Sequence, residues 1–182
     1  MNVPAAGRIG RVSPATVKYP HLLFTVLDVV YALPLLSVQE VTTLDVVPPA
    51  RAATDALIGS HALRFQSIPL VDLGVVLEQR RITTTRTSCT LVVPGGPSQA
   101  NTPIGLVVEA VNGVKSLPPS DMTPPPRMAM LGHGQIVAAL AASDGGFIPV
   151  LDARRIAACA DVDAAVRAWR AAAPEASIPA LE

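Results

Sequence analysis

Aromatic residues and a surplus of charge are the features that this sequence lacks most clearly. Only 3% of its 182 residues are aromatic, and 14 basic residues balance 14 acidic ones to a formal net charge of zero. Binding to nucleic acid requires rings for base stacking or a basic surface for phosphates. With neither present, the composition predicts no nucleic-acid partner.

Metal ligands are equally scarce. The two cysteines, Cys89 and Cys159, form no CxxC pair, and the three histidines share no ligand-like spacing with them or with one another. A zinc site needs several such ligands converging on one point. We therefore expect neither a metal nor another cofactor, and cysteine usage of this kind suits a reducing, cytoplasmic compartment.

Long uninterrupted apolar runs are missing as well. Asp28 and Pro34 interrupt the most apolar stretch, 22–38, and residues 1–18 contain no continuous apolar segment. A membrane-spanning helix needs about 20 consecutive apolar residues. We expect no signal peptide and no direct membrane insertion, and we interpret residues 1–18 as a flexible arm.

Motifs for catalysis do not occur: there is no GxSxG elbow and no complete dinucleotide-binding loop. Asp72 and Asp152 are the only acidic residues that recur in matched positions. Paired carboxylates can perform acid–base chemistry if a cleft holds them together. A carboxylate directly after a strand more often caps the following turn, so capping is the favoured interpretation.

Aliphatic residues, by contrast, are abundant, since hydrophobic residues make up 50% of the chain. Two patterns repeat: Ile68–Asp72 recurs as Ile148–Asp152, and Leu36–Val41 is echoed by Leu106–Val111. Internal similarity of this kind indicates two β units of one plan, with loops of different length.

Local patterns predict several elements. A half-buried strand is expected over 63–68, followed by a short helical segment over 68–73, and a single helical turn over 56–58. The apolar run 104–111 predicts one buried strand, and a hairpin is expected across 143–146.

A terminal amphipathic helix is predicted from an apolar stripe at helical spacing: Val162, Ala165, Val166, Trp169 and Ala173. Asp161 is placed to cap its start, and Asp163 lies one helical turn from Arg167. Trp169 is expected to pack against the second β unit, with an extra docking role for the helix as the alternative.

Glu40 and Arg64 stand out in aliphatic surroundings. Opposite charges on adjacent strands can pair and, when partly buried, fix register or orient a binding surface. Two unrelated surface charges are the alternative, and the residues alone leave the choice open.

Taken in order, several short motifs resemble the CheW-like family, the adaptor proteins of bacterial chemosensory arrays. The motifs are Tyr31–Leu35, Val38–Val41, Gly59–Leu73, Ile104–Val108, Pro124–Pro126 and Phe147–Asp152. Together they cover about residues 20 to 158. The sequence departs from the family pattern at Phe65, where a glycine is usual, and at Glu109, where an aspartate is common.

The resemblance implies a mainly β fold of two small five-stranded, SH3-like β-barrels that share a core, plus a C-terminal helix. It places one CheW-like domain at 19–158 and the terminal helix and tail at 159–182. It also implies a non-enzymatic cytoplasmic adaptor, recruited to membrane receptor arrays. The implied partners are the regulatory domain of a CheA-type histidine kinase and the cytoplasmic tips of chemoreceptors.

The protein-binding residues expected from this resemblance are Val38, Glu40, Arg64 and Phe65. An adaptor in another pathway, such as pili control, surface sensing or second-messenger signalling, fits the same residues. A different class, a small-barrel enzyme or ligand-binding domain, would use Asp72, Asp152 and a histidine in a polar cleft between the two units.

Overall fold

The structure is a computed structural model, and the residues that it describes are 18–44, 54–63, 66–126 and 135–172. Short strands dominate, because alternating and continuous aliphatic runs favour extended backbone. The elements in chain order are β1 (Pro20–Val26), β2 (Val29–Pro34), the 3-10 turn η2 (Leu35–Ser37), β3 (Glu40–Thr43), β4 (Leu57–Leu63), β5 (Gln66–Asp72), α1 (Leu73–Glu78), β6 (Cys89–Val93), η3 (Pro97–Gln99), β7 (Ile104–Val108), β8 (Ala110–Ser116), η4 (Pro119–Asp121), β9 (Met122–Thr123), β10 (Val137–Ser143), β11 (Gly146–Leu151), α2 (Ala153–Ala158) and α3 (Ala160–Ala172).

Two β-sheets built on one plan form the fold. The six-stranded sheet has the order β8-β1-β2-β11-β10-β9, and the five-stranded sheet has the order β3-β6-β7-β5-β4. When the two-residue strand β9 is left out, β8-β1-β2-β11-β10 corresponds position by position to β3-β6-β7-β5-β4. The repeated Ile-Pro motifs lie in β5 and β11, which occupy matching positions. Among the described residues both sheets keep unpaired edges, so their hydrogen-bonded ladders do not close, but the two interlocked β units are consistent with the SH3-like fold that was expected.

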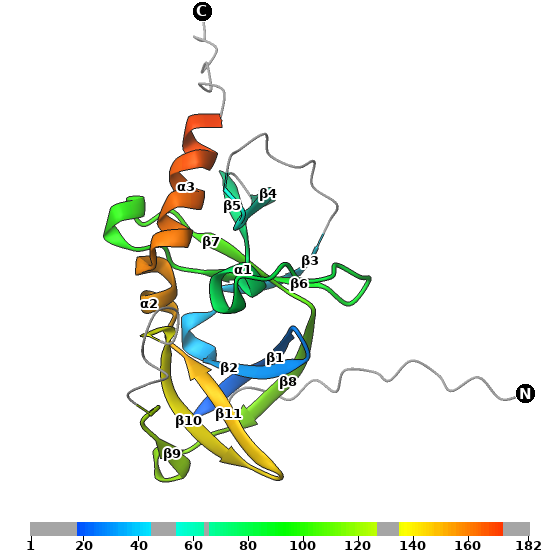
Figure 1. Cartoon of the computed structure of the whole chain (residues 1–182), viewed down its shortest axis with the longest axis vertical. Helices are drawn as coiled ribbons and strands as arrows, with labels where there is room; N and C mark the ends of the chain where they lie inside the picture. The colour runs from blue at the N-terminus through cyan, green and yellow to red at the C-terminus, as the bar shows by residue number, and fades with distance from the viewer. Residues whose placement is uncertain (1–17, 45–53, 64–65, 127–134, 173–182) are drawn as a thin grey trace, which may run out of the picture.

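The chain exchanges strands between the two sheets (Figure 1). β1 and β2 lie in the six-stranded sheet, but the next strand, β3, pairs with β6 of the five-stranded sheet. In the same way β8 follows β7 out of the five-stranded sheet and pairs with β1. The two sheets are therefore interlocked, and side chains from both enter one continuous core, which includes Phe24 and Leu106.

The turn between β1 and β2 is formed without glycine. Leu27 and Asp28 both have positive φ angles, 49° and 66°, and Val26 faces Val29 across the hairpin. A two-residue turn with both residues at positive φ matches the twist of the strands. Aspartate tolerates this conformation, whereas leucine adopts it at a cost in backbone strain.

The recurring aspartates cap helices, as the sequence predicts. Asp72 Oδ1 accepts hydrogen bonds from the backbone N–H groups of Gly74 and Val75, at 2.9 and 3.3 Å, at the start of α1. Asp152 Oδ1 does the same for the two residues after Ala153, at the start of α2. Each motif thus ends a strand and begins a short helix at the corresponding place in its sheet.

Four local predictions were wrong. The helical turn expected over 56–58 is instead the approach to and start of β4, because pairing with β5 outweighs the local capping signal. The strand expected over 63–68 is divided between β4 and β5, two antiparallel neighbours, with residues 64 and 65 outside the described residues. The helical segment expected to follow it over 68–73 is strand as far as Asp72, and α1 begins only at Leu73. The apolar run 104–111 is also divided, since β7 ends at Val108 and the rest begins β8 in the other sheet.

The terminal helix is confirmed as α3, preceded by the separate short helix α2. Val162, Ala165 and Val166 are buried, Trp169 packs half-buried against the core, and Ala173 lies outside the described residues. Asp161 lies within the first turn of α3 and does not precede the helix as a cap. α3 contacts β4, β5 and η3, so it covers the five-stranded sheet (Figure 1). Packing of Trp169 against the second β unit, which is the six-stranded sheet, was expected instead.

Removing the two caps is expected to have unequal effects on stability. Asp72 is 2% exposed and also accepts from the Ile82 N–H at 3.3 Å, so Asp72→Ala leaves three buried donors unpaired. We expect a loss of about 2–3 kcal/mol in the free energy of unfolding. Asp152→Ala removes the same cap at a half-exposed site and serves as the matched comparison, with an expected loss of about 1 kcal/mol. Equal losses in urea titrations of the two variants would contradict this assignment.

Candidate functional site

An open groove of about 680 Å³ lies where segments of the two sheets meet. One part of its lining comes from the end of β2 and η2, a second from the loop after β6, a third from Ala138 on β10, and a fourth from β11 and α2. The lining residues are Pro34, Leu36, Ser37, Pro94, Gly95, Gly96, Pro97, Ser98, Ala138, Val150, Leu151, Asp152, Ala153, Arg154, Ala157 and Ala158. Most of these side chains are apolar or very small, so the groove suits an apolar partner surface.

Leu36 is the most exposed large apolar residue of the described chain. It lies on η2 in the lining of the groove, and 96% of it is exposed. Ser37 donates to the Pro34 carbonyl at 2.6 Å and the Val38 N–H donates to Leu35, which holds this single turn in shape. The turn therefore presents Leu36 to solvent on a defined backbone, as a contact surface does.

Two of the predicted binding residues follow this turn directly. Val38 is half-buried and packs against the shared core, so part of its surface is available to a partner. Glu40 begins β3 opposite Val92, and the structure shows no ion pair between it and another described residue. Arg64 and Phe65, the other two, lie outside the described residues, between β4 and β5.

The pair expected between Glu40 and Arg64 stays a prediction, because Arg64 lies outside the described residues. β3 and β4 are the two edge strands of the five-stranded sheet, with β6, β7 and β5 between them. β3 and β4 are therefore not hydrogen-bonded neighbours in this sheet.

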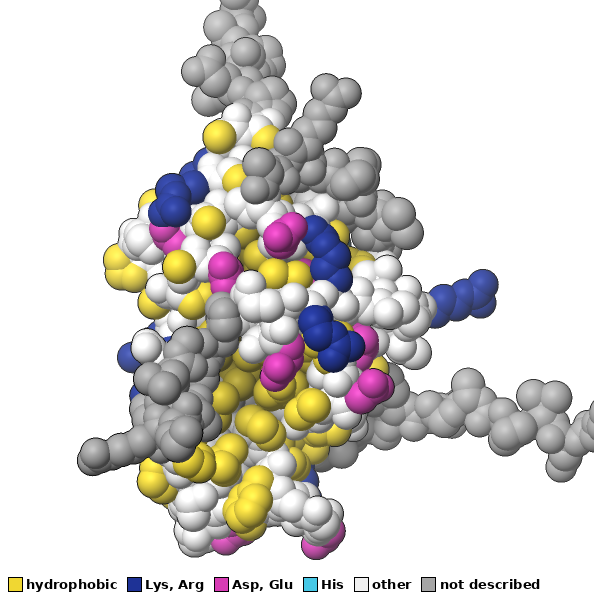
Figure 2. Space-filling model, viewed as in Figure 1, with side chains coloured by type: hydrophobic (Ala, Val, Ile, Leu, Met, Phe, Trp, Pro, Cys, Tyr) yellow, Lys and Arg dark blue, Asp and Glu magenta, His cyan; other side chains and the backbone are white. Residues whose placement is uncertain are grey.

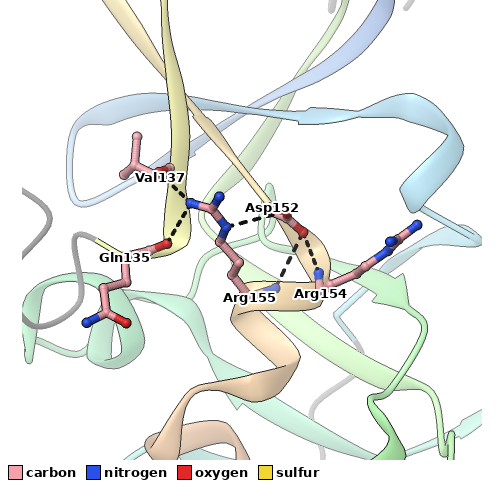
Figure 3. Close-up of polar contacts among 5 residues, drawn as sticks. All are labelled: Gln135, Val137, Asp152, Arg154 and Arg155. Carbon is pink, nitrogen blue, oxygen red and sulfur yellow. Dashed lines mark hydrogen bonds and ion pairs between the residues drawn. The ribbon is translucent and has the colours of Figure 1, made fainter. Parts of the chain in front are cut away.

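One side of the groove is fixed by Arg155 (Figure 3). Its Nη1 donates to the carbonyl oxygens of Gln135 and Val137, at 3.1 and 3.3 Å, and its Nε lies 3.7 Å from Asp152 Oδ2. These contacts tie the first turn of α2 to the start of β10. Asp152, whose carboxylate lines the groove, is thereby committed to the cap and to this ion pair.

Arg154, the neighbouring residue, is different. Its side chain is exposed and points away from the cluster around Arg155 (Figure 3). It lines the groove, and no side-chain hydrogen bond or ion pair joins it to another described residue. The guanidinium is thus available to a carboxylate on a partner.

Acid–base chemistry is not organised at this site. Asp72 caps α1 in the five-stranded sheet and Asp152 caps α2 beside the six-stranded sheet, so the recurring carboxylates serve separate helices. Burial raises the pKa of Asp72 above 3.8, although its hydrogen bonds to the backbone work in the opposite direction. Burial likewise raises the pKa values of the Cys89 and Cys159 thiols, which favours the unreactive protonated form.

Sequence reasoning did not find the groove. Its lining comes from segments that are far apart in the chain, and no local pattern links them. The Pro94–Pro97 segment is recognisable as a loop from its prolines and glycines, but that signal does not reveal a binding wall. The described residues contain no cluster of three or more histidine, cysteine, aspartate or glutamate side chains suited to a metal ion.

Comparison with known proteins identifies the fold and the family. The model of the CheW-like domain matches residues 20–160. This chain belongs to the CheW-like family. A chemotaxis protein CheW from Klebsiella aerogenes is 27% identical over 122 residues, which are 67% of this chain and 71% of the relative.

A solved structure shows the same fold. The scaffolding protein TtCheW from Thermoanaerobacter tengcongensis superimposes with a TM-score of 0.65 at 20% identity, covering 76% of this chain and 86% of that one. Membership of the CheW-like family supports the interpretation as a chemotaxis adaptor and not an enzyme. Within the described part of the chain, every helix is too short or too polar to cross a membrane.

Adjacent arginines provide a test of how the groove is held. Arg155→Ala removes two hydrogen bonds to carbonyl groups, and we expect a loss of about 1–2 kcal/mol in the free energy of unfolding. Arg154→Ala removes an exposed side chain with no described partner and is expected to change stability by less than about 0.5 kcal/mol. Thermal or chemical denaturation of both variants measures the difference. A larger loss for Arg154→Ala would show that the roles are assigned the wrong way round.

Proposed function

We propose that this protein is a non-enzymatic coupling adaptor that joins the cytoplasmic tips of chemoreceptors to the regulatory domain of a CheA-type histidine kinase. The observation that carries the proposal is the open apolar groove with Leu36 exposed in it, in a chain of the CheW-like family. The protein then works in the cytoplasm and is held at receptor arrays by its partners.

The groove fits a helical partner. An α-helix with its side chains is about 10–12 Å wide, and amphipathic helices commonly place their apolar face in grooves of this kind. The small side chains of Gly95, Gly96 and Ala157 let such a helix approach closely. Arg154 then offers one charge with which an acidic residue of the receptor tip can pair.

The four residues expected from the resemblance extend this surface. Val38 and Glu40 follow η2, which carries Leu36 in the groove lining. A receptor tip bound in the groove can therefore also contact the end of the β2–β3 connection and the start of β3. Arg64 and Phe65 complete the proposed receptor-facing surface. Phe65 replaces the usual glycine with a ring, so this adaptor is expected to select receptors that accommodate that ring.

A second apolar surface is suited to the kinase. Phe147 is 63% exposed and Val29 is 42% exposed, and they lie near the starts of the neighbouring parallel strands β11 and β2, in which Val150 faces Ala32. Both side chains therefore lie at one end of the six-stranded sheet. Figure 2 shows apolar side chains gathered over the lower half of one face of the molecule, with a band of charged side chains above them.

Two separate surfaces are what coupling requires. A contact through a small apolar surface buries an area at the low end for specific complexes and is therefore weak. Weak contacts combine in an array, because a tethered component rebinds at a high effective concentration. Binding of receptor and kinase on different surfaces allows both to be held at once.

Single substitutions should separate the two contacts. Leu36→Asp places a charge in the apolar groove and is expected to weaken binding to a receptor-tip fragment at least tenfold, which corresponds to about 1.4 kcal/mol. Phe147→Asp is expected to weaken binding to the kinase regulatory domain to a similar extent. Each variant is the control for the other, and calorimetric titration against both partners measures the four affinities. Loss of both partners in either variant would contradict two separate surfaces.

Charge reversal at Arg64 tests the residues assigned by resemblance. Arg64→Glu is expected to abolish receptor binding while the free energy of unfolding changes by less than about 0.5 kcal/mol, because the role proposed for Arg64 is in binding and not in packing. The measurement is a pulldown with the receptor-tip fragment, accompanied by thermal denaturation. Arg86→Glu, an exposed arginine outside the proposed surface, is the matched control. Normal receptor binding by Arg64→Glu would remove Arg64 from the site.

A further inference from the structure

The loop that follows β6 is held in an unusual conformation. Its residues 94–98 line the groove, and the chain returns at Thr102, close to where it left. A Cβ atom on Gly95 would collide with the Thr102 carbonyl oxygen, so only glycine allows the two ends of the loop to meet. Ala100 and Asn101 follow with positive φ angles of 49° and 57°. For alanine this conformation is strained, and such strain persists only where the surroundings impose it.

Gln99 supplies the first of these constraints. It is 1% exposed, and its side chain uses both of its polar ends. Oε1 accepts from the Gly96 N–H at 2.7 Å, which closes the loop on itself. Nε2 donates to the Ala157 carbonyl at 2.8 Å and to Asp163 Oδ1 at 3.2 Å, which fastens the loop to α2 and α3.

Arg170 supplies the second constraint from the last turn of α3. Its Nη2 donates to the Gln99 carbonyl oxygen and, at 2.9 Å, to Thr102 Oγ1. Backbone and side chain of Gln99 are thus both held by the helices. The loop is one wall of the groove, and α2 forms part of another, so these contacts set the distance between two walls.

We propose that Gln99, supported by Arg170, is the positioning residue that keeps the groove open in its binding shape. The proposal rests on the function proposed above and adds a role for α3: residues beyond 160, where the family match ends, shape the receptor site without touching the receptor. A preformed groove avoids the cost of ordering the loop when a partner binds. When the loop is loosened, only the molecules with a correctly shaped groove can bind. The apparent affinity is then the intrinsic affinity multiplied by the fraction of such molecules.

The test uses full-length protein and the purified cytoplasmic tip of a chemoreceptor from the same cell. Gln99→Glu keeps the acceptor for Gly96 but places a carboxylate oxygen against the Ala157 carbonyl and Asp163. We expect at least a fivefold weaker affinity for the receptor tip and faster hydrogen exchange at the Gly96 and Ala100 amides. Adding Asp163→Asn provides a donor for the carboxylate introduced at position 99 and is expected to recover part of both effects.

Two further variants complete the design. Arg170→Ala, at an exposed position, is expected to reproduce the faster loop exchange without unfolding the protein. Arg167→Ala breaks only the exposed ion pair between Asp163 and Arg167 and is expected to change neither readout. A general loss of stability would not be recovered by Asp163→Asn, so the recovery identifies positioning.

The outcomes distinguish this inference from the function on which it rests. Wild-type protein that binds the receptor tip, with Gln99→Glu binding equally well, overturns the positioning role and leaves the adaptor function intact. Unchanged exchange at Gly96 in Gln99→Glu also overturns it. Wild-type protein that does not bind the receptor tip overturns the use of the groove and, with it, this inference.

Discussion

The exchange of β3 and β8 between the two sheets is the constraint on which the rest of the structure depends. Backbone N–H and C=O groups in a buried ladder must be paired. Here β3, which follows the β1–β2 hairpin, completes the five-stranded sheet, and β8, which follows β7, completes the six-stranded sheet. Neither unit can therefore move away from the other without breaking a ladder. The groove begins where the chain passes from β2 to β3, so its position follows from the crossing itself. A binding site built in this way inherits the rigidity of the shared core.

Matched positions in the two units then acquire different roles. Asp72 and Asp152 have the same capping geometry, but one is buried beneath the loop that contains Ile82 and the other lies in the lining of the groove. The first stabilises the five-stranded unit, and the second positions the wall that carries Arg154. The surroundings of each copy, and not the motif itself, determine whether it serves stability or binding.

Much of the fold can be predicted from the sequence, because the sequence patterns that indicate it are local or repeated. The Ile-Pro motif with its aspartate, the stripe on α3 and the ordered motifs of the family all indicate the observed elements. Local signals failed where pairing with a distant strand decided the outcome, as at Leu57, which faces Val71 in β5. The groove was not predictable for a related reason: Leu36 reads as a core residue, and only the three-dimensional arrangement shows it exposed. Gln99 likewise reads as an ordinary loop residue, because its partners lie in helices much later in the chain.

The interlocked sheets also determine the order in which the protein is completed during synthesis. All strands of the five-stranded sheet have been made once the ribosome passes Val108, whereas the six-stranded sheet needs the chain as far as Leu151. Among the described strands β1 and β2 are made earliest, and their outer neighbours β8 and β11 follow only much later in the chain. Until then the two edges of the β1–β2 hairpin are open to pairing with other nascent chains, a known route to aggregation. Because β1 and β2 pair with each other, each leaves only one edge open until β8 and β11 have been made.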